Sequence, residues 1–438
     1  MSIIVGVGGR IYVGMINKSS NDDHAEVVIR IQKNQSIDKD SCWECFQPKA
    51  FYFAHAALAK PFKTKTKANI IRQMNMVNVV LSILSLVMLL FFIKKLVTNK
   101  LWQKIIMSFW LTNPAFWGIS VQATNDVAVI FLGTLAILCL HQLWNKGGSF
   151  WAIGCALSAS LAPMIKGSGL GVFTLCFIGL SLFWMLRKKH GVGIFILFIS
   201  SVYYFNFSHY RQSYDYSGSA FTTNLIKTGT PPMFDDGKEF WKRPGIASIT
   251  SGYLKVPFIS LLQTPYIVNL DSGYATHRTS YWTLMYGSFY NVYYLSHPEH
   301  WTNTTHFVQN TARALYILGI LPLFLLALGF IKSIKELIFN VFRKSWSSTH
   351  WTNAMLAVLA LVYFVFTLKY SYDYRDYGCV KAIFLLPAIV AAAHFINVGR
   401  RLFKPKWHRY FGVVFGILIV GQIVNVVTLA VALSKVFL

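Results

Sequence analysis

Apolar stretches alternate with short polar connections along almost the whole chain. A hydrocarbon core of about 30 Å is crossed by roughly 20 apolar residues in a helix, and about eleven stretches qualify. They cover residues 3–16, 69–93, 105–121, 125–144, 150–165, 168–186, 191–206, 313–331, 352–368, 381–397 and 410–434. The first is short, and the third and fourth almost touch at a hairpin after Pro114. The pattern predicts an all-α polytopic membrane protein with about eleven transmembrane helices.

Basic residues predict which connections face the cytoplasm, because short connections rich in Lys and Arg stay on that side. Four basic clusters fall in every second connection, so a model with the N-terminus inside places all four together. They are Lys94, Lys95, Lys100 and Lys104; Arg187, Lys188 and Lys189; Lys332, Lys335, Arg343 and Lys344; and Arg400, Arg401, Lys404, Lys406 and Arg409. We expect one transmembrane module, 1–438, with two longer outer segments at 17–68 and 207–312.

The N-terminal stretch MSIIVGVGGRIYVG has neither the basic start nor the small-residue cleavage site of a signal peptide. We interpret it as a short first span.

Composition agrees with a membrane protein and excludes an ordinary soluble domain. Of 438 residues, 55% are hydrophobic and only 13% are charged, with a net charge of +25. So large a positive charge also occurs in nucleic-acid binders, but here the basic residues interrupt apolar runs and form no single cationic face. The apolar content excludes intrinsic disorder.

An acidic pair opens the first outer segment. Asp22 and Asp23 come directly before a helical pattern that places His24, Val27 and Val28 on one face. Asp23 lies three residues before Glu26, an acidic variant of the capping box, so it could merely cap the helix. A carboxylate at the mouth of an apolar bundle could instead act as a general base. Spacing alone favours capping.

Cys42 and Cys45 form a single CxxC motif in the same outer segment. A local disulfide in an oxidising compartment is the favoured interpretation. Zinc would need two further ligands, for which only His24 and His55 are near. We predict no divalent metal and no cofactor, because the acidic pair is the only acidic cluster outside a Pro-rich turn at Asp235 and Asp236.

The order of these features resembles a family of integral-membrane glycosyltransferases with the GT-C fold. The branch is that of the protein O-mannosyltransferases and the lipid A aminoarabinose transferase, within the dolichyl-phosphate-mannose-protein mannosyltransferase superfamily. Asp22-Asp23-His24 resembles its acidic motif. Gln47-Pro48-Lys49-Ala50-Phe51-Tyr52 resembles its Q-P-P-L-Y-Y motif, with Lys49 in place of the second proline.

Further motifs follow in the family's order. Arg72 resembles the basic residue that opens the second span, and Asn113-Pro114 with Thr124-Asn125-Asp126 resembles the N-P and N-D pair. Lys166 resembles a lysine at the outer end of the fifth span. Lys381, before Leu385-Leu386-Pro387, resembles the arginine of a late G-R-Y-x-L-P motif, but lysine lacks the bidentate fork that suits a phosphate.

The resemblance implies transfer of a sugar from a polyprenyl-phosphate donor to a lipid, glycan or protein acceptor on the outer face, with inversion. It implies Asp22 or Asp23 as the catalytic base. The substrate-binding set is expected to include His24, Glu44, Gln47, Tyr52, Arg72, Asn125, Asp126, Lys166, Arg211, Arg278, Tyr281, Arg375 and Lys381. The alternatives are that each cation only snorkels to the headgroups and that Asn125 and Asp126 only cap a helix.

Aromatic residues in the second outer segment recur at helical spacing. Trp282, Tyr286, Phe289 and Tyr293 suggest a helix lying in the membrane interface that grips a lipid tail or closes over the sugar. A plain aromatic belt is the alternative.

Two other function classes stay open at this point. A secondary transporter or lipid flippase would use polar residues inside the spans as a pathway, and often shows inverted repeats, which the sequence lacks. A catalytically inactive scaffold with the same fold is the other. The expected membrane is a bacterial inner membrane, with the endoplasmic reticulum as the alternative; no nucleic-acid partner is expected.

Overall fold

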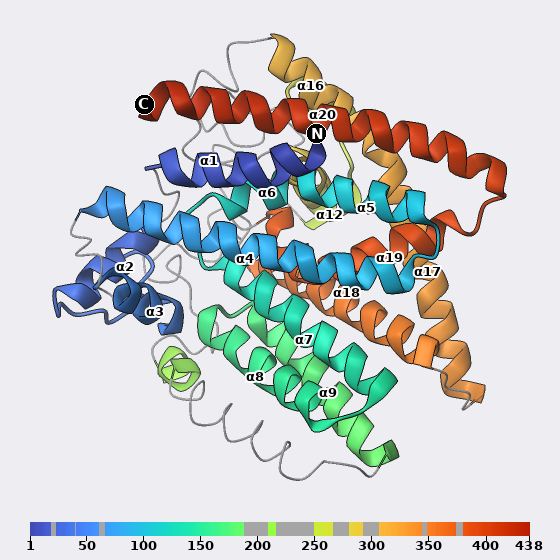
Figure 1. The fold of residues 1–438 in the computed structure, drawn as a ribbon, viewed down its shortest axis with the longest axis horizontal. Coiled ribbons are helices and arrows are strands. Elements are labelled where there is room, and N and C mark those ends of the chain that lie inside the picture. Colours follow the sequence, from blue (N-terminus) through green and yellow to red (C-terminus); the bar gives the residue numbers. More distant parts are fainter. Residues whose placement is uncertain are drawn as a thin grey trace.

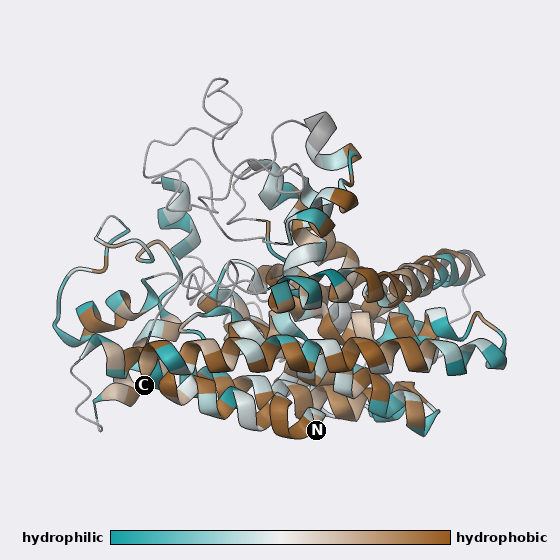
Figure 2. Ribbon diagram, turned by 90° about the horizontal axis from the view of Figure 1, so that it is seen from above, coloured by the Kyte–Doolittle hydropathy of each residue, from teal (hydrophilic) through white to brown (hydrophobic). Residues whose placement is uncertain are grey.

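The computed structural model describes residues 1–18, 23–39, 41–60, 66–187, 209–215, 249–265, 280–291, 306–343, 348–373 and 380–438. Every regular element in these ranges is a helix, and seven segments are long and apolar enough to cross a membrane. The long helices lie side by side in an elongated bundle (Figure 1). Hydrophobic residues run along their lengths and hydrophilic ones gather near their ends (Figure 2). The prediction of an all-α polytopic membrane protein is confirmed.

Most predicted spans correspond to helices. The long segments are α4 (Lys67–Leu96), α7 (Asp126–Lys146), α9 (Gly169–Arg187), α16 with α17 (His306–Leu318 and Ile320–Arg343), α18 (Ser348–Asp373), η5 with α19 (Ala382–Ala388 and Ile389–Arg400) and α20 (Pro405–Phe437). Shorter apolar helices are η1 with α1 (Ile4–Gly8 and Gly9–Ile16) and α8 (Ser149–Ile165). The predicted span 191–206 lies outside the described residues.

The predicted span 105–121 is not one helix. α5 (Lys100–Thr112) ends before Asn113, and α6 (Pro114–Ser120) begins at Pro114. Proline has no N–H to donate and clashes with the preceding turn, but it suits the first position of a helix. The Asn113 side chain accepts a hydrogen bond from the N–H of Phe116 (3.0 Å), which caps the new helix.

After α6 the chain runs as an irregular segment, residues 121–125, into α7. Non-helical backbone in a membrane bundle must find partners inside the protein. Here buried amides supply them: Asn17 donates to the Val121 carbonyl (2.9 Å), and Asn78 of α4 donates to the carbonyls of Gln122 and Thr124 (2.7 Å each). These bonds fix the segment and therefore the start of α7.

Arg10 of α1 is fully buried where α1, α5 and α6 meet. Its guanidinium donates to the Leu111 carbonyl (2.7 Å), to the Ser120 hydroxyl (2.8 Å) and to the Gly6 carbonyl. It also lies 5.2 Å from the centre of the Phe116 ring. The side chain joins the three helices at the break between α5 and α6.

α17 and α19 pack unusually close. A Cβ added to Gly329 would lie 2.0 Å from the Phe395 carbonyl oxygen, and one added to Gly399 would lie 1.9 Å from the Leu325 oxygen. Small residues at such crossings let helix backbones approach, which is how membrane helices gain packing contacts. This contact secures α19 and, through it, the preceding η5.

Two basic clusters meet at one end of the bundle. The Asn397 amide donates to the Leu96 carbonyl (3.3 Å), so α4 and α19 end side by side, next to Lys94–Lys95 and Arg400–Arg401. α7 ends there too, since Phe92 of α4 contacts His141 of α7 (5.5 Å between ring centres). The N-terminal ends of α4 and α7 therefore lie at the opposite end, the outer one in the predicted topology.

The first outer segment folds into α2 (His24–Gln32) and α3 (Ala50–Ala59), joined by turns that contain a disulfide between Cys42 and Cys45. The prediction of a local disulfide is confirmed. The capping-box prediction is wrong: Asp23 is the N-cap of α2, but its side chain makes no capping hydrogen bond and binds Lys67 instead (2.7 Å).

In the second outer segment the described helices are α12 (Ile249–Leu254), α13 (Phe258–Gln263) and α14 (Tyr281–Tyr290). The predicted aromatic helix is α14, and it packs against other helices of the protein. Phe289 packs against Trp110 of α5 (5.7 Å between ring centres), and the Tyr286 hydroxyl donates to the Tyr316 carbonyl. Trp282 keeps 38% of its surface exposed, and Tyr293 lies outside the described residues.

Candidate functional site

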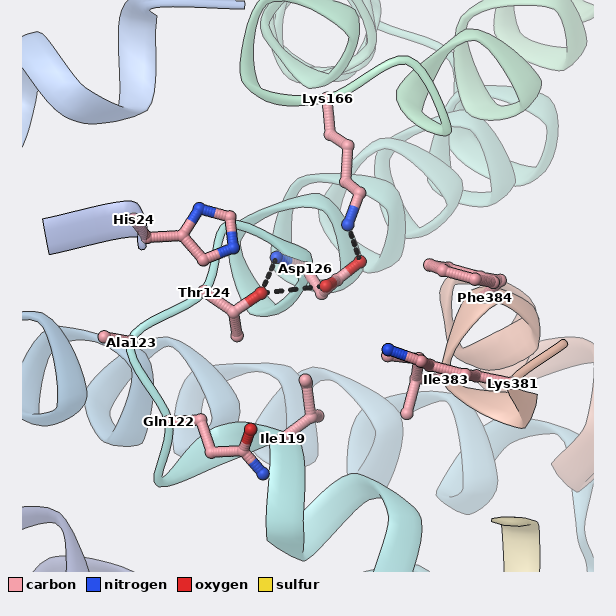
Figure 3. Close-up of a pocket in the computed structure, with 10 residues that line it drawn as sticks. All are labelled: His24, Ile119, Gln122, Ala123, Thr124, Asp126, Lys166, Lys381, Ile383 and Phe384. Atoms are coloured by element: carbon pink, nitrogen blue, oxygen red, sulfur yellow. Dashed lines mark hydrogen bonds and ion pairs between the residues drawn. The ribbon is translucent and has the colours of Figure 1, made fainter. Parts of the chain in front are cut away.

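A pocket, called the outer pocket below, lies at the end of the bundle that the predicted topology places outside, where irregular segments converge (Figure 3). It has an empty volume of about 420 Å³, counted with the solvent at its mouth. Its walls come from the start of α2, the segment between α6 and α7, the turn between α8 and α9, and η5. The lining residues are His24, Ile119, Gln122, Ala123, Thr124, Asp126, Lys166, Lys381, Ile383 and Phe384.

A buried ion pair forms one part of the wall. The Lys166 ammonium lies 2.7 Å from a carboxylate oxygen of Asp126, and the two side chains are only 16% and 9% exposed. The Thr124 hydroxyl donates to the other oxygen of Asp126 (2.8 Å). Ionisable groups at membrane depth are costly unless they pair or line a cavity, and these two do both.

The chain positions this pair where α8 ends and α7 begins. α8 ends at Ile165, and Lys166 is extended (φ −159°, ψ 148°), so its side chain leaves the helix axis. The Asn125 amide donates to the Ile165 carbonyl (3.2 Å), which ties the start of α7 to the end of α8. Asn125 is also the N-cap of α7, but it makes no side-chain capping bond.

A second cation comes from a separate segment, the residue before η5. Lys381 is the extended residue before η5, and only 9% of its surface is exposed. Phe384, one turn later, contacts the Lys166 ammonium, which lies 5.3 Å from its ring centre. Among the described lining residues, Lys166 and Lys381 therefore give one side of the pocket two cations next to the carboxylate of Asp126.

His24 forms the facing wall, across the pocket from Lys381 (Figure 3). Its Nδ1 shares a hydrogen bond with the Tyr52 hydroxyl (2.8 Å), and a carboxylate oxygen of Glu44 lies 3.8 Å from the same nitrogen. His24, Glu44 and Tyr52 are all buried. The imidazole is therefore held from behind by α3 and the turn that carries Glu44.

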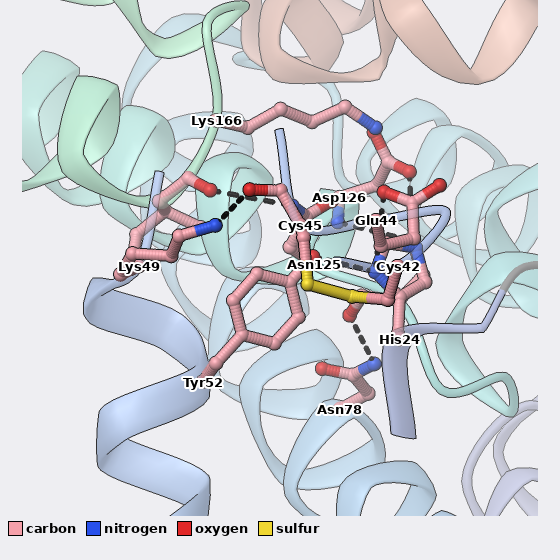
Figure 4. A network of polar contacts seen from close by, with 12 residues as sticks. His24, Cys42, Glu44, Cys45, Lys49, Tyr52, Asn78, Asn125, Asp126 and Lys166 are labelled. Atoms are coloured by element: carbon pink, nitrogen blue, oxygen red, sulfur yellow. Dashed lines mark hydrogen bonds and ion pairs between the residues drawn. A yellow bond between two sulfur atoms is a disulfide. The ribbon is translucent and has the colours of Figure 1, made fainter. Parts of the chain in front are cut away.

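The disulfide encloses Glu44, since Cys42 and Cys45 lie on either side of it (Figure 4). The Lys49 ammonium donates to the Cys45 carbonyl and so braces the same turn. Burial lowers the pKa of Lys49 to about 8, with the charge of Lys39 as a smaller cause. The lysine that replaces the second proline of the motif thus holds the turn behind the pocket.

The structure brings together much of the predicted site. His24, Asp126, Lys166 and Lys381 line the pocket, although they lie far apart in sequence. Glu44, Tyr52 and Asn125 contact this wall from behind.

Other predicted residues lie elsewhere. Asp23 is half exposed and paired with Lys67, and Arg211 is exposed and 3.8 Å from Asp215. Tyr281 is buried and bonded to Thr367 (2.8 Å). Gln47 and Arg72 do not line the pocket. Asp22, Arg278 and Arg375 lie outside the described residues.

Sequence reasoning missed part of the lining. Gln122, Ile383 and Phe384 line the pocket without having been singled out, and Thr124 was quoted only as part of a motif. The signal for Ile383 and Phe384 was their place directly after Lys381. Nothing in the hydropathy marked Gln122, because its role depends on where Asn78 holds its backbone.

No protein-family model matches the chain, and no curated protein matches it. Solved structures with a similar course of the chain include the oligosaccharyltransferase of Archaeoglobus fulgidus, in a complex with Zn and sulfate. It has a TM-score of 0.48 at 10% identity and is matched over 97% of this chain and 53% of its own. ArnT from Cupriavidus metallidurans, bound to undecaprenyl phosphate, has a TM-score of 0.46 at 10% identity, with 99% and 76% covered.

The archaeal oligosaccharyltransferase AglB, in complex with an inhibitory peptide and a dolichol-phosphate, matches with a TM-score of 0.45 at 12% identity. It is covered over 55% of its length. The chain thus spans about half the length of the archaeal proteins it matches.

Proposed function

We propose that the protein is a membrane glycosyltransferase of the GT-C type, which moves a sugar from a polyprenyl-phosphate donor to an acceptor on the outer face of the membrane. The observation that carries the proposal is the outer pocket, with Lys166 and Lys381 on one side and His24 of the acidic motif on the other. Four separate segments of the chain line the pocket, and each contains one of the motifs that resemble those of the GT-C family.

The two sides of the pocket fit the two halves of a transfer. A lipid-linked donor keeps its tail in hydrocarbon while its phosphate reaches the interface, where buried cations stabilise the charge that develops on the departing phosphate. Lys381 and Lys166 take this role. Asp126 orients Lys166 through its 2.7 Å contact, and the aromatic face of Phe384 lies beside the sugar.

The acidic motif lies on the acceptor side. Asp22 and Asp23 directly precede His24, and in this proposal one of the two carboxylates deprotonates the acceptor hydroxyl or steadies it by accepting its hydrogen bond. Attack from this side on a sugar whose phosphate lies at Lys381 is a direct displacement with inversion. The proposed reaction needs no metal ion, and the proposed location is a bacterial inner membrane.

The test is transfer of labelled sugars from a panel of polyprenyl-phosphate donors by purified protein in detergent or proteoliposomes. Wild type should transfer at least one sugar, and Asp22→Asn or Asp23→Asn should lower the rate by about 10² or more, as loss of a catalytic carboxylate does. Full activity in both substituted proteins removes the carboxylates from the mechanism. A folded wild type that transfers no sugar from any donor contradicts the function itself.

A further inference from the structure

A basic surface lies at the end of the bundle away from the outer pocket. The ends of α4 and α19 and the starts of α5 and α20 meet there (Figure 1). The end of α7 adjoins them, since Lys146 lies close enough to Lys95 for the two charges to repel each other. The basic surface consists of Lys94, Lys95, Lys100, Lys104, Lys146, Arg400, Arg401, Lys404, Lys406 and Arg409.

The cations of the basic surface are not balanced by carboxylates. None of them forms an ion pair with a described residue. Glu336 of α17 is bound instead to Lys332 (3.7 Å) and to Asn353 (2.9 Å). Basic residues in short connections are enough to orient a membrane protein, but here three connections bring their cations together, where like charges repel. An anion from outside the chain would relieve that repulsion.

Arg400 is the buried member of the basic surface, with 4% of its area exposed. Its guanidinium lies 4.9 Å from the centre of the Trp102 ring of α5 and donates to the Asn397 side chain (3.0 Å) and to Nδ1 of His408 in α20 (3.1 Å). Its Nε has no hydrogen-bond partner among the described residues. A buried charge is costly unless an opposite charge lies near it, and none of these partners is an anion.

Exposed apolar and aromatic side chains flank the cations. Leu101 at the start of α5 is 61% exposed, and Trp407 and Tyr410 at the start of α20 are 47% and 62% exposed. Tryptophan and tyrosine favour the boundary between headgroups and acyl chains. A phospholipid would use both features of this region, because its headgroup can contact the cations while its acyl chains contact the apolar groups.

We propose that the basic surface binds the headgroup of an anionic phospholipid from the adjacent leaflet. Its phosphate lies at Arg401, close to the buried charge of Arg400, and its acyl chains follow α5 and α20. Lys95 and Lys146 add positive charge from α4 and α7. Clusters of Lys and Arg at the ends of transmembrane helices attract acidic lipids, and basic pockets between such helices bind their headgroups. The bound lipid stabilises this end of the bundle, and the proposal does not depend on the proposed function.

The experiment uses the full chain in dodecyl maltoside, with lipid binding measured by native mass spectrometry and stability measured by thermal unfolding. The probes are phosphatidylglycerol and phosphatidylcholine with the same acyl chains, inorganic phosphate, and polyglutamate. One variant combines Lys95→Gln with Arg401→Gln, which changes exposed residues only, and a second is Arg400→Gln. The matched control combines Lys33→Gln with Lys435→Gln, which removes the same charge from exposed positions outside the basic surface.

Wild type should bind phosphatidylglycerol about tenfold or more tightly than phosphatidylcholine, and its unfolding temperature should rise more with the anionic lipid. The variant with Lys95→Gln and Arg401→Gln should lose most of this preference and of the temperature shift, while it unfolds like wild type in phosphatidylcholine. Arg400→Gln should lose the preference too. The control should bind phosphatidylglycerol within about twofold of wild type, because its substitutions lie beyond the range of screened charges.

Three results would overturn the proposal. The first is equal binding of the two lipids by wild type. The second is an equal loss of phosphatidylglycerol binding in the control, which would show that binding follows net charge rather than this surface. The third is a stabilisation of the same size by inorganic phosphate or polyglutamate without lipid, which would identify a soluble anion or an acidic protein as the ligand. None of these results decides whether the protein transfers sugar.

Discussion

Two buried cations of the bundle, Arg10 and Lys166, are stabilised in different ways against the cost of burying a charge. Arg10 is enclosed completely: its Nε and Nη1 donate to a hydroxyl and two carbonyls, and its guanidinium lies over an aromatic ring, while Nη2 has no hydrogen-bond partner among the described residues. Within the described residues it forms no ion pair. Lys166 is held by a carboxylate and lines a pocket. A buried cation whose hydrogen bonds go to the backbone and side chains of neighbouring helices fixes those helices, whereas a cation that lines a cavity can contact a substrate. We therefore expect Arg10 to stabilise the fold and the cations of the outer pocket to act on the substrate.

The largest effect is expected for the pocket cations. Lys381→Ala should lower the rate of sugar transfer by about 10² to 10³, because a group that stabilises developing charge in a water-excluded site contributes most in the transition state. Lys381→Arg keeps the charge and is the control, with a loss of about tenfold at most from its different shape. The measurement is the initial rate per folded molecule. Near-wild-type rates for Lys381→Ala would end the assignment of chemistry to this side of the pocket.

Arg10→Leu should act on stability instead. It leaves the Leu111 carbonyl and the Ser120 hydroxyl without their buried donor, at a cost of about 2–4 kcal/mol. Transfer per folded molecule should stay close to wild type. Unfolding in mixed micelles gives the stability and the transfer assay gives the rate. A hundredfold loss of rate without a loss of stability would place Arg10 in the site and break the comparison.

Asn78 of the long helix α4 holds the segment that lines the pocket. Asn78→Asp replaces the donating amide with a carboxylate that faces two carbonyls, so stability should fall by about 1–3 kcal/mol and transfer should fall by about tenfold as Thr124 and Asp126 shift. Ser85→Ala on the same helix, whose hydroxyl bonds only to the Leu81 carbonyl, is the control and should change both much less. Equal effects in the two variants would show that α4 does not position the site.

The smallest effect is expected at the exposed pair. Lys67 and Asp23 are 51% and 54% exposed, and ion pairs in water contribute about 0–1 kcal/mol. Lys67→Gln should therefore change the stability by less than about 1 kcal/mol, with little change in transfer. A large loss measured at high salt would mean that this pair is part of the pocket structure.

The sequence predicted the helices well where hydropathy alone decides, as in α4, α7 and α20. It failed at Asn113-Pro114, because apolar residues on both sides of the proline made two helices look like one span. At α14 it predicted the helix but not its packing partners, since an aromatic stripe at helical spacing has the same pattern whether it faces lipid or other helices. Those distinctions depend on tertiary contacts such as that of Phe289 with Trp110.

In the site, too, the local sequence indicated some residues, whereas their contacts depend on the tertiary structure. His24, Asp126, Lys166 and Lys381 were predicted because the short motifs that contain them resemble, in type and order, those of the GT-C family. Their partners could not be assigned in advance. Whether Asp23 caps α2 or binds Lys67, and whether Asp126 caps α7 or pairs with Lys166, depends on residues 40 or more positions away.

The central claim is that the outer pocket holds the sugar–phosphate end of a lipid-linked donor. It is tested most directly by photolabelling with a polyprenyl-phosphate sugar that carries a diazirine on the sugar, followed by peptide mapping. The account predicts labelled peptides from residues 119–126 and 381–384, with labelling reduced in Lys381→Ala. Labelling confined to the half of the bundle next to Lys94–Lys95 and Arg400–Arg401, and unchanged in Lys381→Ala, would contradict it.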